Sequence, residues 1–204
     1  MTAIIDYGAG NLHSVKNALD FLGEENVITS DLDVIRSADR VILPGVGAFG
    51  DAMACMKKAG LIEVVKETAQ SGKPFLGICL GLQLLFESSE EKEGVEGLGI
   101  FKGKVVRIPQ AEGLKIPHMG WNSLEITKDS KILCGLGDNP FVYFVHSYYI
   151  LPEDESDVSA YTAYGARLGI AVERGNVFAT QFHPEKSGEI GMKILKNFIS
   201  LGEV

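Results

Sequence analysis

The sequence has few cysteines, no long apolar run and fewer basic than acidic residues. Its 204 residues include only three cysteines, an odd and small number that argues against a disulfide framework and is typical of a reducing compartment. No stretch reaches the ~18 apolar residues of a membrane-spanning helix. The first residues also lack the basic region and apolar run of a signal peptide. We therefore expect a soluble, cytoplasmic protein with no membrane partner.

The excess of acidic residues gives a formal net charge of -8. Because binding to a nucleic-acid backbone needs a basic face, we expect no nucleic acid as a partner. The hydrophobic fraction of 46% and the charged fraction of 23% are ordinary for a globular protein. The length fits one domain spanning residues 1–204, and no pattern indicates a metal or a cofactor.

Short apolar strands alternate with helical patterns in the first half of the chain, which is typical of parallel βαβ units. Pro44-Gly45 is expected to end the third strand, and the acidic stretch 87–96 is expected to be an exposed loop. The predicted strands are 2–5, 27–29, 40–43 and 74–78, and the predicted helices are 12–22, with Asn11 as its cap, 50–58, 61–71 and 80–87.

The second half contains strands with little helix between them. Gly175-Asn176 fits a hairpin turn between two of these strands. The whole pattern predicts an α/β fold with an open, mixed, mostly parallel central sheet, helices on both faces and an added antiparallel section in the second half. The predicted strands are 103–108, 124–127, 141–145, 159–164, 171–174 and 177–181, and a last helix covers 190–199.

Cys79 stands between Gly77 and Gly81, directly after an apolar strand and directly before a helix. This is the arrangement of a G-x-S-x-G nucleophile elbow, with sulfur in place of oxygen. Glycines relieve the crowding of so sharp a turn, and a helix N-terminus favours a thiolate over a thiol. The N–H of Leu80 is suitably placed to hold an oxyanion. We predict that Cys79 is a nucleophile rather than a buried packing residue.

The other two cysteines lack this context. Cys55 falls inside a predicted helix, where we interpret it as a small packing residue. Cys134 lies in a glycine-rich loop without neighbouring catalytic groups, and its role stays open.

His183 is the best candidate for the base that serves Cys79. Pro184 favours an extended conformation at His183, and in extended chain the side chains of His183 and Glu185 project to the same side. The carboxylate can then fix the tautomer of the ring, as the third member of a triad does. The remaining histidines are one in a predicted helix, interpreted as solvated or packed, and two that stay possible: His13, His118 and His146.

Cys79, His183 and the segment Pro44-Gly45-Val46-Gly47 each follow a predicted strand. Open α/β sheets bind ligands beyond the carboxyl ends of their strands. The backbone at Val46 and Gly47 can present N–H groups to a substrate, and we consider it a second part of the oxyanion hole. The alternative is an ordinary turn at the end of a strand.

Six stretches together resemble the class I glutamine amidotransferases, a family with a Cys-His-Glu triad. Within that family the strongest resemblance is to the glutaminase subunits of imidazole glycerol phosphate synthase. The elbow and the His-Pro-Glu motif are shared by the whole class, whereas PGVGAFG, PHMGWN and VHSYY are more particular to those subunits. The stretches are DYGAGN at 6–11, LPGVGAFG at 43–50, GICLGLQ at 77–83, PHMGWN at 117–122, FVHSYY at 144–149 and QFHPEKS at 181–187.

The resemblance implies a flavodoxin-like fold and hydrolysis of glutamine to glutamate and ammonia through a glutamyl thioester. It implies that Gln83 binds substrate, which agrees with a position one helical turn beyond Cys79. It also places Glu91 near the α-amino group of glutamine, although Glu91 equally fits a solvated loop acid. Main-chain groups beside the amino-acid end of glutamine are implied for His146, Ser147 and Tyr148.

Ammonia released into solution would escape, so the chain needs a partner over the site. The resemblance implies a (β/α)8-barrel cyclase that uses the ammonia to make imidazole glycerol phosphate and aminoimidazole carboxamide ribotide in histidine biosynthesis. The interface candidates, for which local core packing is the alternative, are Pro117, Met119, Trp121, Asn122 and Lys186.

Three other functions stay open. The chain could be a glutaminase subunit for another pathway, such as pyridoxal phosphate or anthranilate synthesis. It could be a Cys-dependent γ-glutamyl hydrolase or peptidase that works without a partner. It could also be a non-catalytic scaffold subunit, against which the intact triad argues.

Overall fold

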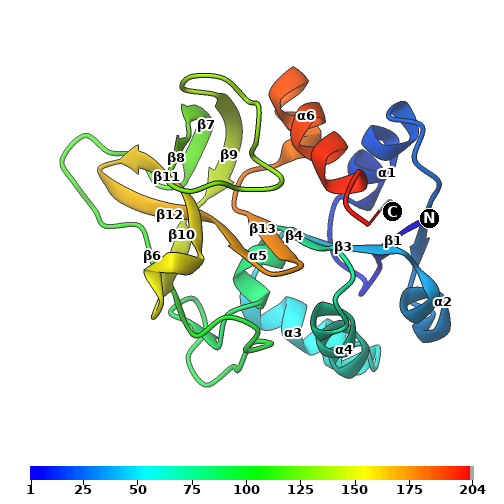
Figure 1. Ribbon diagram of the computed structural model, residues 1–204. Coiled ribbons are helices and arrows are strands. Elements are labelled where there is room, and N and C mark those ends of the chain that lie inside the picture. Colours follow the sequence, from blue (N-terminus) through cyan, green and yellow to red (C-terminus); the bar gives the residue numbers. More distant parts are fainter. Residues whose placement is uncertain (203–204) are drawn as a thin grey trace.

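Five parallel strands form the centre of the sheet in the computed structural model, which describes residues 1–202. Each strand is short and fully or partly buried, as expected for strands covered on both faces. Figure 1 shows this part of the sheet between two layers of helices. In spatial order the strands are β2 (Asn26–Thr29), β1 (Thr2–Ile5), β3 (Arg40–Gly45), β4 (Phe75–Cys79) and β13 (Val177–Thr180).

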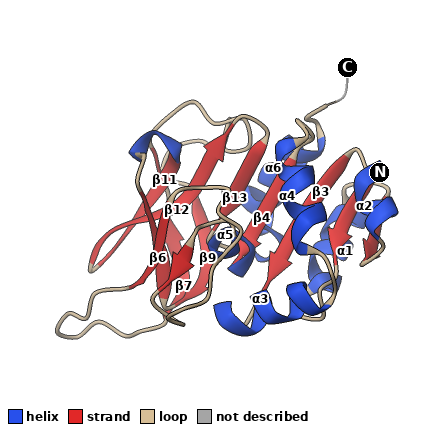
Figure 2. Ribbon diagram, turned by 90° about the horizontal axis from the view of Figure 1, so that it is seen from below, coloured by secondary structure: helices blue, strands red, loops and turns tan. Residues whose placement is uncertain are grey.

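The helices lie on both faces of these strands (Figures 1 and 2). Side chains alternate between the faces, so Ile4 packs on the side of α1 (Leu12–Phe21) and α6 (Gly188–Ile199). Ala3 and Ile5 pack on the opposite side, because successive residues of a strand point to opposite faces. The helices on that opposite side are α2 (Leu32–Ser37), α3 (Phe49–Lys58) and α4 (Ile62–Gln70).

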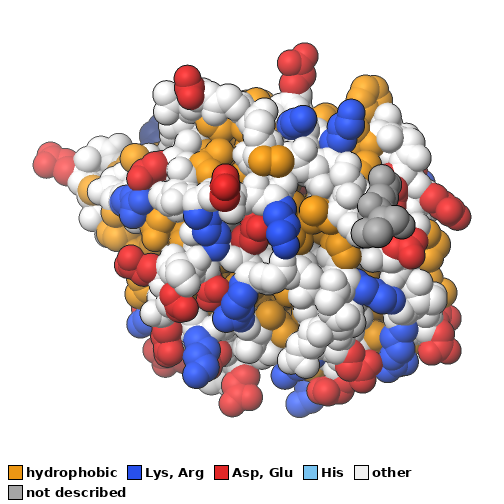
Figure 3. All heavy atoms as spheres, in the orientation of Figure 1, with side chains coloured by type: hydrophobic (Ala, Val, Ile, Leu, Met, Phe, Trp, Pro, Cys, Tyr) orange, Lys and Arg blue, Asp and Glu red, His pale blue; other side chains and the backbone are white. Residues whose placement is uncertain are grey.

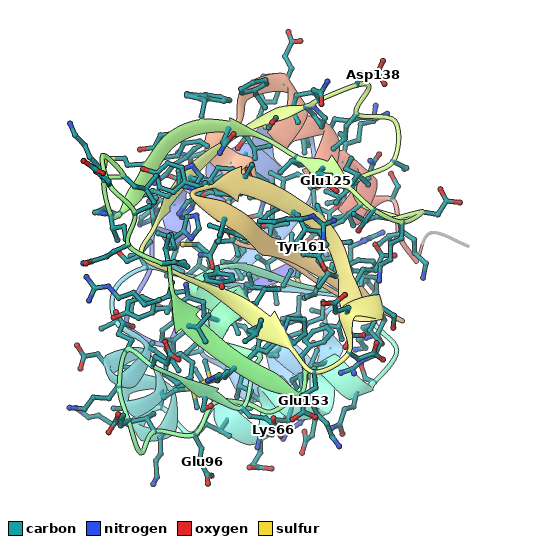
Figure 4. The ribbon with its side chains drawn as sticks, turned by 90° about the vertical axis from the view of Figure 1, so that its left-hand side faces the viewer. Lys66, Glu96, Glu125, Asp138, Glu153 and Tyr161 are labelled. Carbon is teal, nitrogen blue, oxygen red and sulfur yellow. The ribbon has the colours of Figure 1, made fainter. Side chains whose placement is uncertain are left out.

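Strands that are antiparallel to their neighbours, except for one short parallel pair, extend the sheet beyond β13. Gly175-Asn176 makes the predicted hairpin turn, since Arg174 pairs with Val177. Figure 4 shows this end of the sheet, with Glu125 and Tyr161 labelled. The Arg167 guanidinium lies 3.5 Å from the ring centre of Tyr161 and 2.8 Å from Glu125. The added strands are β12 (Ala166–Arg174), β10 (Tyr148–Pro152), the parallel pair β6 (Gly103–Arg107) and β5 (Ser88–Ser89), β11 (Val158–Tyr164) and β8 (Glu125–Ile126).

A separate two-stranded ribbon consists of β7 (His118–Ser123) and β9 (Phe141–His146), which are antiparallel. The β7–β9 ribbon packs against α6 and against β11. Two short 3-10 turns complete the fold: η1 (Glu155–Asp157) and η2 (Pro184–Lys186).

The expected α/β fold with a mostly parallel sheet and an antiparallel section is confirmed, but some elements differ. Six elements were not predicted: the helix α2, the strands β5, β7 and β10, and the turns η1 and η2. The helix α2 has only six residues, which is too short to show a repeating apolar pattern in the sequence. Asp31 caps it, and its side chain accepts from the N–H groups of Asp33 and Val34. The Asn11 side chain makes no capping hydrogen bond to α1.

The third strand ends at Pro44-Gly45, as predicted, but β3 includes both residues and so is two residues longer than the expected 40–43. On one side Gly45 pairs with Cys79. On the other side β1 pairs with β3 only as far as Ile42. The missing N–H of Pro44 therefore lies beyond the paired part of β1, which makes proline tolerable in a central strand.

The helix predicted at 80–87 is shorter than expected, since α5 covers only Leu80–Leu84. The N–H groups of Leu85 and Phe86 bond to carbonyls three residues back, which tightens the chain into a 3-10 turn. The acidic stretch that follows is mostly a loop, as predicted, but Ser89 is buried and pairs in β5.

No helix in residues 1–202 is long and apolar enough to cross a membrane. On the face drawn in Figure 3, basic and acidic side chains are mixed, and neither kind forms a large continuous patch.

Candidate active site

Cys79 is the last residue of β4 and the N-cap of α5. Its φ of 55° and ψ of -108° place it outside the ordinary regions for an L-residue. Within the described chain only one other non-glycine residue, Asn139, has a positive φ. Such strained backbone is typical of functional sites, and here it turns the thiol out of the strand direction, as an elbow does.

The two glycines that flank Cys79 are required by close backbone contacts. A Cβ on Gly77 would lie 3.0 Å from the carbonyl group of Gly81 and 3.1 Å from the Cβ of Ala179. A Cβ on Gly81 would overlap the backbone carbonyl of Leu43 in β3. The glycines therefore let the elbow fold back on itself and let α5 approach β3.

The imidazole of His183 lies just beyond β13, the parallel neighbour of β4, where Thr180 pairs with Ile78. Its main chain is fixed to the ribbon, because the N–H of His183 donates to the Tyr143 carbonyl at 3.1 Å. The Nδ1 atom of the His183 ring lies 2.8 Å from Oε1 of Glu185. Both side chains are only 2% exposed.

Burial alone would lower the pKa of His183. Interactions with the thiol of Cys79 and the carboxylate of Glu185 outweigh that effect and raise the pKa to about 9 from an ordinary value of 6.5. These interactions therefore favour the protonated form of the ring. Its Nε2 atom is buried without a conventional hydrogen-bond partner among residues 1–202, so it remains available for a substrate.

The other two buried histidines, His118 and His146, have no ring nitrogen without a partner. Both ring nitrogens of His146 are engaged, Nδ1 with the Tyr148 carbonyl at 2.8 Å and Nε2 with Nδ1 of His118 at 2.9 Å. His13 is exposed on α1, as predicted. Among the histidines, His183 thus best fits a proton-transfer role beside Cys79.

A cavity of about 330 Å³ lies in front of Cys79 and His183. This volume is at the small end of ligand pockets, which span about 300–1,000 Å³. Most of the residues chosen from the sequence line it, whereas Glu185 stands behind His183. The lining residues are Val46, Gly47, Cys79, Leu80, Gln83, Glu91, Pro117, Val145, His146, Ser147, Tyr148 and His183.

Gln181 is a site residue that sequence reasoning did not select. Its Nε2 lies 3.7 Å from the Sγ of Cys79, and its Oε1 accepts from Nε2 of Gln83 at 3.1 Å. It is completely buried. The signal was its position two residues before His183, which puts both side chains on the same side of an extended chain.

Glu91 and Val46 border the cavity in different ways. One carboxylate oxygen of Glu91 accepts from the N–H of Phe49 at 2.7 Å, at the start of α3. Val46 is exposed, and Gly47 has a φ of 100° that favours glycine. Gly45 is confined, because a Cβ there would lie 2.5 Å from the hydroxyl of Tyr7.

The proposed interface residues do not form one group. Met119 and Trp121 are 62% and 55% exposed on the outer face of the ribbon, and Lys186 is exposed on η2. Pro117 borders the cavity. Asn122 faces the opposite side of β7 from Trp121, where its amide donates to the Ala163 carbonyl at 3.0 Å, so it does not belong to the exposed face.

Comparison with solved structures supports the fold. A structure described as a glutamine amidotransferase has a TM-score of 0.76 and 22% identity, covering 99% of this chain and 99% of that chain. The PurLQS structure from Thermotoga maritima has a TM-score of 0.75 and 22% identity, covering 97% and 96% of the two chains.

Sequence relatives are more similar. The imidazole glycerol phosphate synthase subunit HisH of Caldanaerobacter subterraneus subsp. tengcongensis is 54% identical over 198 residues, covering 97% of each chain. The HisH subunit of Aquifex aeolicus is also 54% identical, covering 97% of this chain and 95% of its own. The model of the family described as glutamine amidotransferase class-I matches residues 3–201. The chain therefore belongs to the class I glutamine amidotransferases, as its motifs indicate.

Proposed function

We propose that this chain hydrolyses glutamine to glutamate and ammonia, with Cys79 as nucleophile, His183 as the proton-transfer group and Glu185 as the residue that orients it. The observation that carries the proposal is that one cavity is lined by a strained elbow cysteine and by a histidine bonded to a buried carboxylate. These are the parts that a thiol-based acyl transfer needs.

In the first step Cys79 attacks the carboxamide carbon of glutamine as a thiolate, its proton being held by the imidazolium of His183. The carbonyl oxygen gains the negative charge. The imidazolium of His183 then gives its proton to the departing nitrogen, which leaves as ammonia while a glutamyl thioester remains. Neutral His183 next takes a proton from water, whose oxygen attacks the thioester. Glutamate leaves, and the thiolate of Cys79 and the imidazolium of His183 are restored. The raised pKa of His183 favours its proton-donor role in the first half of this cycle.

The oxyanion would be held by the N–H of Leu80 and by backbone groups of Val46 and Gly47. Gln83 and Glu91, together with the main chain of His146, Ser147 and Tyr148, would hold the amino-acid end of glutamine. The position of all these residues around one cavity supports these roles.

We further propose that the chain is the glutaminase subunit of an imidazole glycerol phosphate synthase in the cytoplasm, and that it supplies ammonia for histidine biosynthesis. The names of relatives at 54% identity support this pathway. The partner would be a (β/α)8-barrel cyclase. The exposed side chains of Met119 and Trp121 support a docking face beside the cavity, because aromatic and methionine side chains are enriched at protein interfaces.

The test is to measure glutamate release by the chain alone and with the cyclase and its nucleotide ligand. We expect slow release alone and strong stimulation by the complex, because the exposed backbone at Val46 and Gly47 would be fixed only on docking. Full activity of the isolated chain would exclude this coupling. Turnover of γ-glutamyl peptides without a partner would instead favour a hydrolase.

A further inference from the structure

The β7–β9 ribbon has two faces with different chemistry. The cross-strand pairs Met119–Val145 and Trp121–Tyr143 point outward, and Trp121 contacts Tyr143 edge to face with ring centres 6.2 Å apart. The pair His118–His146 points inward, and both of its side chains are buried. We call these two residues the histidine pair.

The hydrogen bonds of the histidine pair allow one assignment of protons when both rings are neutral. A carbonyl only accepts, so Nδ1 of His146 donates to Tyr148 at 2.8 Å. Its Nε2 is then an acceptor, and Nδ1 of His118 donates to it at 2.9 Å. Nε2 of His118 is left as an acceptor for the amide of Asn122 at 3.4 Å. Every ring nitrogen therefore has one partner of the right kind.

The surroundings keep the pair neutral and fixed. The His118 ring is stacked between Tyr164 and Phe144, at centre distances of 3.9 and 4.7 Å. Burial lowers the pKa of His118 to about 4. Burial, opposed by the bond to Tyr148, lowers the pKa of His146 to about 4 as well. Two neutral, fully bonded rings hold a geometry that apolar side chains of the same size would not specify.

The hydrogen-bond chain continues from the histidine pair to the nucleophile. The Tyr148 carbonyl that accepts from His146 lies 3.4 Å from Nε2 of Gln83. Gln83 also donates to Gln181 at 3.1 Å, and Gln181 reaches the sulfur of Cys79 at 3.7 Å. A continuous set of polar contacts thus runs from β7 to Cys79.

We propose that His118 and His146 are positioning residues that couple the outer face of the β7–β9 ribbon to the glutamine cavity. A partner docked on Met119 and Trp121 would restrain β7, and the histidine pair would transmit that restraint to the Tyr148 carbonyl and so to Gln83. The inference rests on the proposed function, in which this cavity binds glutamine and the ribbon meets a partner.

Three variants separate this role from simple packing. His118→Phe keeps an aromatic ring between Tyr164 and Phe144 but removes the donor to His146. His118→Asn loses the ring but keeps an N–H close to the position of Nδ1. The matched control is Thr162→Val, which removes a different, partly buried hydrogen bond to β7, from the buried Thr162 side chain to the Ser123 carbonyl at 2.8 Å.

The measurement is the KM and kcat for glutamine, with and without the cyclase. We expect His118→Phe to raise KM in the complex about tenfold, the size of one lost buried hydrogen bond, and to remove most of the effect of the partner on KM. The kcat should change less than about threefold. His118→Asn should recover most of the loss, and Thr162→Val should leave KM unchanged. An unchanged KM in His118→Phe, or an equal rise in Thr162→Val, would overturn the proposal.

A second measurement does not depend on activity. Nitrogen NMR of the imidazole rings at pH 7 should show both His118 and His146 neutral, each with its proton on Nδ1. An Nε2–H tautomer at His146 would contradict the proposed series of hydrogen bonds, even if the enzyme were active. If the unmodified complex failed to hydrolyse glutamine, the proposed function would fall, while the ring spectra would still report on the histidine pair.

Discussion

The Nδ1 atom of His183 lies 2.8 Å from Oε1 of Glu185, although the two residues are separated by a single proline. Both side chains are nearly inaccessible to solvent. Because a carboxylate accepts hydrogen bonds and does not donate, this contact keeps a proton on Nδ1 whether the ring is neutral or charged. The proton on Nε2 is then the one that can be exchanged with Cys79 or the substrate. The orientation of the ring is thus set locally, within the tripeptide His183-Pro184-Glu185.

Replacing Glu185 with glutamine should remove that control at almost constant volume. An amide can present either oxygen or nitrogen to Nδ1 and no longer stabilises an imidazolium. We expect Glu185→Gln to lower kcat for glutamine by roughly 100-fold or more, by analogy with the loss of the orienting carboxylate in other triads. The kcat is measured from steady-state glutamate release. Use of added ammonium salt by the complex is the control and should not change.

The protonation of His183 should be visible in its own titration. Its folded pKa of about 9 exceeds the ordinary 6.5, so the charged ring stabilises the fold. That contribution is complete below pH 6.5 and is lost as the pH rises through about 9. Ring NMR should give a midpoint near 9 in the native chain and a lower one in Cys79→Ala, which lacks one of the stabilising partners. A native midpoint at or below 6.5 would refute the assigned charge state.

Tyr7 carries a hydroxyl that stability measurements can test. It is buried beside Gly45 and makes no hydrogen bond within residues 1–202, and burial raises its pKa well above the ordinary value. Because an unpaired buried hydroxyl is costly, Tyr7→Phe should leave the free energy of unfolding unchanged or raise it by about 0.5–1 kcal/mol. Urea denaturation checks this. Thr162→Val, which does lose a bond, should lower the same quantity by about 1 kcal/mol. A clear loss of stability in Tyr7→Phe would show that its hydroxyl has a partner in solution.

The outer face of the ribbon should matter for assembly and not for folding. Trp121 is 55% exposed, so Trp121→Ala should change the unfolding free energy little. If the face docks the cyclase, the variant should weaken the complex by about 2 kcal/mol, or roughly 30-fold in Kd, as a central aromatic residue does. Calorimetric titration with the cyclase measures this Kd. Phe21→Ala is the control, because Phe21 is 81% exposed on α1 and belongs to no proposed interface. Equal effects of both variants would exclude a specific docking face.

Much of this site could be predicted because its signals are local. The elbow at Cys79 is defined by five consecutive residues, and the His183–Glu185 pair by three. The position of each after an apolar strand was enough to place them at the same sheet edge. The neighbouring positions of β4 and β13 then brought them to one cavity.

The parts that were missed depend on contacts between distant segments. The strands β7 and β10 contain histidine, glycine and proline, which obscure a strand pattern, and pairing with β9 and β6 stabilises them. The role of Gln181 follows from meeting Gln83, which is 98 positions away. The inward direction of Asn122 likewise follows from the ribbon register, which no short sequence window contains.

The most direct test of the account is the Cys79→Ala variant assembled with the cyclase and supplied either with glutamine or with ammonium salt. The account predicts that product formation from glutamine is abolished while formation from ammonium salt continues at the rate of the unmodified complex. If Cys79→Ala still used glutamine at the unmodified rate, the sulfur at this elbow would not be the nucleophile.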